Sequence, residues 1–200
     1  MKTLKRSLGL LKRQLGRMVE IKAGILLHQP VAAREGAGIP GAQLTRASVY
    51  RPDLDYSKDE FTRRNLRQND LYELLVDRRP VCFGWVARAG ARVGILHDIQ
   101  MTVPDRAFYI WDCVTPPEYR GRGYFQSLLK QLVSSRDTGA NLALVAVDTR
   151  NTASRKALAK AGFQPLLSYL SIRVLGRVVL AVANRGHRLS QAQILFDQLA

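Results

Sequence analysis

Residues 112–125 decide the fold of this chain, and they read Asp-Cys-Val-Thr-Pro-Pro-Glu-Tyr-Arg-Gly-Arg-Gly-Tyr-Phe. The apolar run that leads into them predicts a strand, and Pro116-Pro117 ends it because proline cannot donate to a sheet ladder. Gly121 and Gly123 then predict a tight turn. Apolar side chains follow at the spacing of an amphipathic helix, and they are Phe125, Leu128, Leu129, Leu132 and Val133. The stretch is therefore a strand, a glycine-rich loop and a helix.

This loop has the chemistry of a phosphate-binding site. The first turn of a helix leaves backbone N–H groups without an intrahelical acceptor, and these groups and the helix dipole attract an anion. Glycine lets the backbone come close to that anion, and Arg120 and Arg122 add cationic donors. The loop has neither the Lys-Ser/Thr ending of a P-loop nor the third glycine of a dinucleotide fold. Taken alone, it could also be a tight turn whose arginines are merely solvated.

The rest of the chain alternates between strand and helix patterns on both sides of this segment. Strands are predicted over 44–50, 71–76, 81–88, 93–103, 107–115, 142–147 and 164–175. Helices are predicted over 56–68 and 152–161, besides the one that begins near Phe125. This order predicts an α/β (α+β) domain with crossover helices at its centre.

Two segments in this order resemble the acyl-CoA-binding elements of the GNAT superfamily. The family pattern Val-x-Pro-x-x-Arg/Gln-x-x-Gly-x-Gly/Ala is matched from Thr115 onward, except that Thr115 replaces the first aliphatic residue and Phe125 replaces the last small residue. The family's Asn-x-x-Ser/Ala element, which ends in Gly-Phe, is matched by residues 151–163. The resemblance covers roughly residues 44–175.

The resemblance implies a GNAT-like fold, with a mixed, largely antiparallel central sheet that is flanked by helices and splayed between the strands 107–115 and 142–147. It implies that the amides of residues 122–125 hold the pyrophosphate of acetyl-CoA and that the main chain of residues 113–115 pairs with the pantetheine arm. The implied cofactor-binding residues are Cys113, Val114, Thr115, Arg120, Gly121, Arg122, Gly123, Tyr124, Phe125, Asn151 and Ser154. The implied activity is acetyl-CoA-dependent N-acetyltransfer to a primary amine, without a metal.

The residues available for proton transfer depart from the better-known GNAT members. Leu158 stands where many of them have an acidic tyrosine, and Ala146 stands where some have a glutamate. We consider Asp112, in the strand before the loop, and Tyr169, which could deliver a proton from the last strand, as catalytic candidates. The alternatives are a carboxylate bonded within the sheet or to Arg120, and a tyrosine of the core.

Other titratable residues carry less weight as site residues. Tyr119 and Tyr124 are weaker candidates for proton transfer, and His97-Asp98 on a predicted strand is expected to be structural. Cys82 and Cys113 lie in apolar, strand-like runs, so we expect two reduced core thiols, with a disulfide or a nucleophilic cysteine as the alternative. The histidines and cysteines show no metal-ligand spacing.

Positive charge is concentrated at the N-terminus of a chain whose formal net charge is +15. Residues 2–19 are basic and also carry apolar side chains at helical spacing, which are Leu4, Leu8, Leu11, Leu15, Met18 and Val19. Such a helix is typical of peripheral contact with an anionic membrane surface. The alternative is a helix docked on its own domain or on a partner subunit, and nucleic acid is not the partner we expect.

We predict a basic N-terminal extension over 1–40, a GNAT-like acyltransferase domain over 41–177 and a C-terminal tail or helix over 178–200 that could build a homodimer. No run approaches the about 20 apolar residues of a membrane-spanning helix, and no cleavable signal is recognised. We therefore expect a cytoplasmic protein, with peripheral membrane contact left open.

Two other functions remain open. The first is a non-catalytic GNAT-like module whose basic helix contacts membrane or nucleic acid. The second is an acyltransferase that takes its acyl group from a carrier protein, because a basic surface suits an acidic carrier. The resemblance implies that the variable N-terminal third builds the acceptor pocket, so the amine itself is not predicted.

Overall fold

The computed structural model describes residues 19–32, 38–52, 57–95, 100–135, 139–175 and 177–185, which form an eight-stranded sheet in the order β10-β9-β1-β8-β7-β4-β3-β2. The strands are β1 (Val19–Pro30), β2 (Ala42–Ala47), β3 (Asn69–Val76), β4 (Arg79–Ala87), β7 (Ala107–Val114), β8 (Leu142–Asp148), β9 (Gln164–Val174) and β10 (Arg177–Arg185). Neighbours run antiparallel except β7 and β8, which are parallel. The predicted mixed, largely antiparallel sheet is confirmed.

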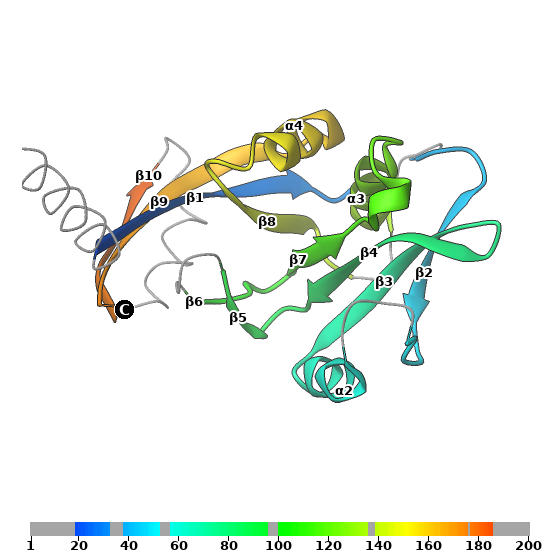
Figure 1. The fold of residues 1–200 in the computed structure, drawn as a ribbon, viewed down its shortest axis with the longest axis horizontal. Coiled ribbons are helices and arrows are strands. Elements are labelled where there is room, and N and C mark those ends of the chain that lie inside the picture. Colours follow the sequence, from blue (N-terminus) through cyan, green and yellow to red (C-terminus); the bar gives the residue numbers. More distant parts are fainter. Residues whose placement is uncertain are drawn as a thin grey trace, which may run out of the picture.

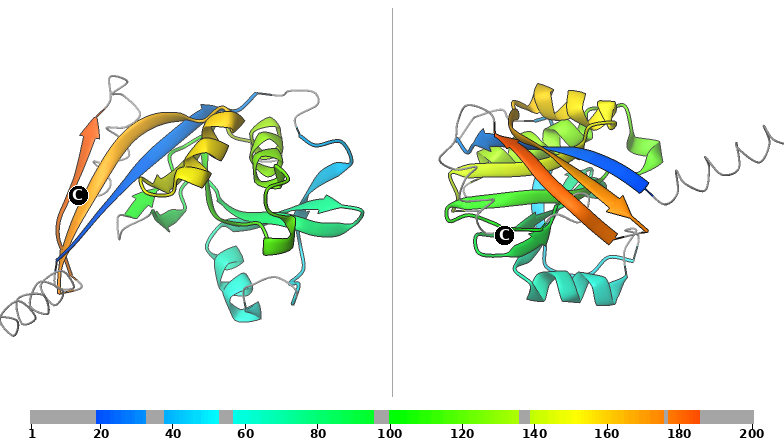
Figure 2. Two further views of the ribbon diagram at one scale, coloured as in Figure 1. Left: turned by 45° about the horizontal axis from the view of Figure 1, so that its top comes forward. Right: turned by 90° about the vertical axis from the view of Figure 1, so that its left-hand side faces the viewer.

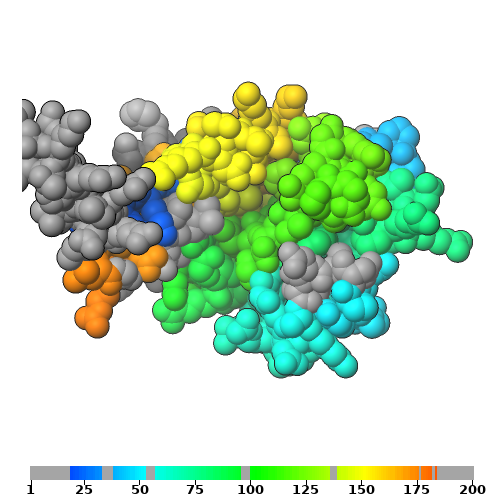
Figure 3. Space-filling model, viewed as in Figure 1, coloured from blue at the N-terminus to red at the C-terminus, as the bar shows by residue number. Residues whose placement is uncertain are grey.

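Helices cover both faces of the sheet (Figures 1 and 2). On one face lie α3 (Tyr124–Ser134) and α4 (Thr152–Ala161), which contact each other. On the opposite face lie α2 (Lys58–Leu66) and the short antiparallel pair of β5 (Arg92–Gly94) and β6 (Gln100–Thr102). The space-filling view shows α3 and α4 along the upper edge of the molecule and α2 along the lower edge (Figure 3).

Apolar side chains hold these layers together. Leu128 of α3 is 0% exposed and packs in one cluster with strand residues, and Leu158 of α4 belongs to the same cluster. On the other face, the ring of Phe61 in α2 lies 5.9 Å from that of Trp85, measured between centroids. Val93 of β5 lies in a further buried cluster on that face. Burying one such large side chain stabilises the fold by roughly 1.5–3 kcal/mol.

The ends of the helices follow from their sequence. The Ser57 hydroxyl accepts the Glu60 N–H at 3.1 Å and caps α2, and Asn151 Oδ1 accepts the Ser154 N–H at 3.0 Å and caps α4. Gly162 ends α4 with φ of +100°, a left-handed conformation that glycine adopts without the cost of a side chain. The predicted end of this helix at Gly162 is confirmed.

The N-terminal boundary of the domain was predicted wrongly. Residues 19–30, placed in an extension by the sequence analysis, form β1 between β8 and β9 in the same sheet. Leu26 and Leu27 of this strand are 1% and 6% exposed. The amphipathic helix pattern was extended to Val19, which in fact begins β1, because the exposed start of the strand also carries apolar side chains, Val19 and Ile21, and Val19 fits the helical spacing.

Two further elements differ from the prediction. The single strand expected over 93–103 is two short strands, β5 and β6, that pair with each other. The segment 178–200, expected to be a tail or helix, begins with the residues of β10, which pairs with β9 at the edge of the sheet. Residues 2–18, His97-Asp98 and the helix expected from Ser190 lie outside the described residues.

Candidate active site

The two central strands of the sheet separate part of the way along their length. β7 and β8 pair in parallel from Ala107 with Leu142 to Ile110 with Val145. Beyond that point β7 continues beside β4 to Val114, while β8 continues beside β1. The predicted splay between these strands is confirmed, and it opens a fork in the middle of the sheet (Figure 1).

A β-bulge shapes the β7 side of the fork. Trp85 pairs with Trp111 and Phe83 pairs with Val114, so Gly84 alone faces both Asp112 and Cys113. Asp112 adopts φ of +47°, as bulge residues do. A β-carbon on Gly84 would lie 2.6 Å from Cys113 Sγ, so only glycine leaves room for that thiol. The bulge places Asp112 and Trp111 toward α2 and Cys113 toward α3.

The loop after β7 leads into an uncapped helix. The 3-10 turn η2 (Pro117–Tyr119) comes first, and then Gly121 and Gly123 adopt φ of +77° and +79°. The first intrahelical bond of α3 runs from the Ser127 N–H to the Gly123 carbonyl at 3.0 Å, so the amides of residues 124–126 precede it. Unlike α2 and α4, α3 has no side-chain cap. A β-carbon on Gly121 would meet nothing within 4 Å, so the loop presents an open surface.

The arginines of this loop are both exposed, but they differ in their bonding. Arg120 Nε donates to the Thr115 carbonyl at 3.0 Å and so ties the loop to the end of β7. The alternative in which Asp112 bonds to Arg120 is not what the structure shows, because Asp112 bonds to Arg64 of α2. The Thr115 hydroxyl donates to Cys82 Sγ at 3.2 Å, which fixes the side chain at the end of the strand.

The second matched segment has a structural role of its own. Asn151 and Ser154, expected to line the cofactor, are joined to each other by the cap of α4. Leu158 is 1% exposed and packs in the core below α4. Ala146 is half-buried at the fork.

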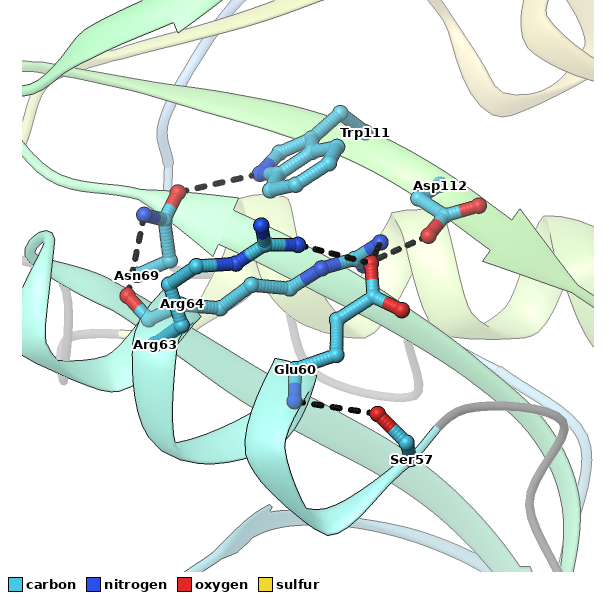
Figure 4. Close-up of polar contacts among 7 residues, drawn as sticks. All are labelled: Ser57, Glu60, Arg63, Arg64, Asn69, Trp111 and Asp112. Carbon is cyan, nitrogen blue, oxygen red and sulfur yellow. Dashed lines mark hydrogen bonds and ion pairs between the residues drawn. The ribbon is translucent and has the colours of Figure 1, made fainter.

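Asp112 is bonded to Arg64 of α2, within a cluster that also includes Glu60 of α2, Trp111 of β7 and Asn69 of β3 (Figure 4). Arg64 Nη1 donates to Asp112 Oδ2 at 2.5 Å, and its Nη2 bonds to Glu60. The Arg64 guanidinium also lies over Trp111, with Cζ 4.4 Å from the ring centroid. The indole N–H of Trp111 donates to Asn69 Oδ1 at 3.1 Å. The side chain of Asp112 remains 44% exposed.

A cavity of about 290 Å³ opens beside this cluster. It lies between α2, β5 and β7, and its lining includes Glu60, Arg63, Arg64, Arg67, Arg92 and Trp111. Trp111 follows Ile110, the last residue of β7 that pairs with β8. The cavity therefore lies on the face of the sheet opposite α3, and Arg64, which lines it, bonds to Asp112.

Tyr169 lies in the core on the same face as this cavity. It is 2% exposed, and its ring crosses over Gly24 of β1, where a β-carbon would come within 2.3 Å of the hydroxyl. Tyr109 lies in the same apolar cluster and is hydrogen-bonded to the backbone of Ala146 at the fork. Burial raises the pKa of Tyr109. The phenol of Tyr169 is thus in the core, as the alternative reading of this residue expected.

A sequence model of the acetyltransferase (GNAT) family matches residues 46–163 of the chain. The chain belongs to this family. The match spans β7, the glycine loop, α3, β8 and α4, which are the elements that form the fork and its helices. No curated protein sequence matches the chain significantly.

Solved structures, two of them described as GNAT acetyltransferases, resemble this GNAT chain at low identity. An acetyltransferase described as a GNAT protein from Novosphingobium aromaticivorans has 15% identity and a TM-score of 0.51, over 80% of this chain and 68% of that one. A conserved protein of unknown function from Staphylococcus epidermidis has 14% identity and a TM-score of 0.52, over 82% and 66%. A GNAT acetyltransferase from Colwellia psychrerythraea has 11% identity and a TM-score of 0.52, over 78% and 56%. This chain thus spans between about half and two thirds of their lengths, and the likeness shows the fold.

The two cysteines of this GNAT domain are free thiols. Burial raises the pKa of Cys82 to about 11 and holds the pKa of Cys113 well above its usual range. Both therefore stay protonated near neutral pH, as expected of core thiols. Within the described ranges, no group of three or more His, Cys, Asp or Glu side chains could hold a metal. No helix in the described part of the chain is long and apolar enough to cross a membrane.

Two residues of the site, Arg64 of α2 and Asn69 at the start of β3, were not predicted from the sequence. Arg64 and Asn69 reach Asp112 and Trp111 across 48 and 42 positions of the chain. No short motif marks them, because their role arises only when α2 packs over β4 and β7. The sequence carries no signal for Asn69 either, because its burial and hydrogen bonds are known only from the structure.

Proposed function

We propose that this chain transfers an acetyl group from acetyl-CoA to a primary amine. The observation that carries the proposal is the fork between β7 and β8, with the glycine loop and the uncapped α3 at its end. Family membership supports acyl transfer as the reaction class. The cavity on the opposite face of the sheet supplies a separate approach for the acceptor.

The residues present fit a CoA ester. The amides of residues 124–126 and the loop at Gly121 and Gly123 would hold the pyrophosphate, because they combine free donors, a helix dipole and an open surface. The main chain of residues 113–115, which no described strand pairs with on the β8 side, would bind an extended arm by strand addition. When bound, acetyl-CoA supplies a thioester that an amine can attack. Arg122, which lies in the loop between the two glycines and is exposed, adds a positive charge.

Asp112 is the better candidate to take the proton of the amine. An amine must be neutral to attack, so a base near the fork is needed. The bond from Arg64 uses Oδ2 of Asp112, which leaves Oδ1 to accept a proton. Tyr169 is less suited, because it is 2% exposed and lies in the core.

Calorimetric titration with acetyl-CoA tests the cofactor site. Gly123→Asp places a carboxylate where the pyrophosphate is expected, so we predict that Kd rises at least tenfold. Gly90→Asp is the matched control, because Gly90 has the same φ of +79° and its β-carbon would meet nothing within 4 Å. The Kd of Gly90→Asp for acetyl-CoA should stay within about twofold of the wild-type value. This variant adds the same charge and the same backbone strain, but at a position outside the glycine loop.

Two results would contradict the proposal. One is wild-type protein that does not bind acetyl-CoA at millimolar concentration, which would favour a carrier-protein donor or a binding module. The other is binding that both variants weaken equally. Release of free CoA in the presence of a panel of amines then tests transfer itself.

A further inference from the structure

The cavity between α2, β5 and β7 carries more positive charge than the structure neutralises. Its lining holds four arginines, Arg63, Arg64, Arg67 and Arg92, against one carboxylate, Glu60. Arg64 is committed to Glu60 and Asp112, and Arg63 lies 3.8 Å from the same Glu60. The charge that remains belongs to the other two arginines.

Arg67 and Arg92 lie on the two sides of this cavity. Arg67 ends α2, and Arg92 begins β5. Arg92 Nε donates to the neutral Gln100 side chain at 2.9 Å, which orients its guanidinium without cancelling its charge. Within the described ranges, no carboxylate lies within ion-pair distance of either residue. A guanidinium offers paired donors that match the oxygens of a carboxylate or a phosphate.

The other wall of the cavity is aromatic and held in place. Trp111 is fixed by its bond to Asn69, and Asn69 Nδ2 donates to the carbonyls of Arg64 and Arg67 at 3.1 and 2.9 Å. Asn69 is 5% exposed, so this support is buried. A volume of about 290 Å³ suits a small molecule.

We propose that this cavity binds the acceptor amine through a second, anionic group, so that the substrate is a small amine carrying a carboxylate or a phosphate. Its anion pairs with Arg67 and Arg92, its carbon skeleton lies against Trp111, and its amino group lies toward Asp112 at the fork. The assignment of the occupant as acceptor rests on the acyl transfer proposed above. The anion site itself rests only on the arginines.

Thermal unfolding with simple anions tests the site independently of activity. Succinate, inorganic phosphate and neutral succinamide are added at constant ionic strength to the wild type, to Arg67→Gln/Arg92→Gln and to Arg46→Gln/Arg79→Gln. The last variant removes the same charge from exposed arginines of β2 and β4, outside the cavity lining. We expect succinate or phosphate to raise the midpoint temperature of unfolding of the wild type and of the control variant, with saturation at high anion concentration. In the cavity variant, this rise in the midpoint temperature should be at least fourfold smaller. The anion that raises the midpoint temperature more shows whether the site prefers a carboxylate or a phosphate.

The proposal is overturned if the three proteins respond alike, or if neither anion acts differently from succinamide. CoA release with matched pairs, such as β-alanine and β-alaninamide or phosphoethanolamine and ethanolamine, tests the acceptor. We expect kcat/KM to favour the anionic member at least tenfold in the wild type and less than threefold in the cavity variant. Equal rates within each pair would overturn the acceptor assignment. If anions stabilise the wild type but no amine causes release of CoA, the anion site is supported and the proposed acetyltransfer is contradicted.

Discussion

At the scale of the residue, the site depends on one bulge. Asp112 takes a left-handed conformation, which aspartate and asparagine tolerate better than most residues. Gly84 opposite leaves room for Cys113, so the thiol turns to the α3 face and the carboxylate turns to the α2 face. A regular strand would place neighbouring side chains in strict alternation. The bulge therefore brings Asp112 and Trp111 to one side of the fork.

Asp112→Asn should lower kcat about 100-fold or more while acetyl-CoA binding changes less than twofold. The amide keeps the left-handed backbone and can still accept from Arg64, but it cannot take a proton, and a general base contributes about 10²–10⁴-fold. Steady-state kinetics with an active amine and calorimetry measure the two quantities. Asp70→Asn is the control, because Asp70 is paired with Arg88 at 2.5 Å on the outer part of the sheet. A kcat within threefold of the wild type in Asp112→Asn would rule out its role as the base.

At the scale of the element, α2 is a short helix fixed at three points. Ser57 caps its start, Phe61 packs on Trp85, and Arg64 bonds to Glu60 within the helix and to Asp112 on the sheet. A helix of nine residues is not stable alone, so these contacts decide its position. The position of α2 in turn sets the walls of the cavity.

Arg64→Lys should lower the free energy of unfolding by about 1–3 kcal/mol. Lysine keeps the charge, but it cannot bond to both carboxylates with a planar fork or stack on Trp111 in the same way. Urea unfolding followed by tryptophan fluorescence measures the change. Arg63→Lys on the same helix is the control, because the Arg63 side chain is 63% exposed, and we expect a loss below about 0.5 kcal/mol there. Equal losses in the two variants would show that Arg64 has no special anchoring role.

At the scale of the whole molecule, the N-terminal strand completes the sheet. β1 pairs with β8 over residues 24–30 and with β9 over residues 19–28, so it joins β9 and β10 to the strands of the fork. In Figure 2 these three strands extend beyond the helices as one curved ribbon. The domain therefore includes residues far upstream of the family match, which begins at residue 46.

A chain that begins at residue 41 should fail to fold cooperatively, whereas one that begins at residue 19 should keep a single unfolding transition. Without β1 the adjoining edges of β8 and β9 are both unpaired, and the buried Leu26 and Leu27 are lost. Circular dichroism during heating, together with the dispersion of the proton NMR spectrum, distinguishes the two cases. A cooperative transition in the shorter chain would mean that β1 is dispensable.

The sequence alone determined the elements that are encoded locally. The strand, glycine loop and helix around residues 107–133 and the capped helix from Asn151 were predictable, because turns, caps and apolar periodicity act over a few residues. The same local patterns carried the resemblance to the GNAT family and hence the fork between β7 and β8.

Only the tertiary structure decided the register, the partners and the acceptor side of the site. β1 could be placed between β8 and β9 only by pairing with residues more than a hundred positions away. The bulge at Asp112 depends on Gly84 in another strand, and the cluster of Arg64 with Trp111 depends on how α2 packs. These features have a common physical reason. They come from contacts between segments distant in sequence, whose geometry no local pattern contains.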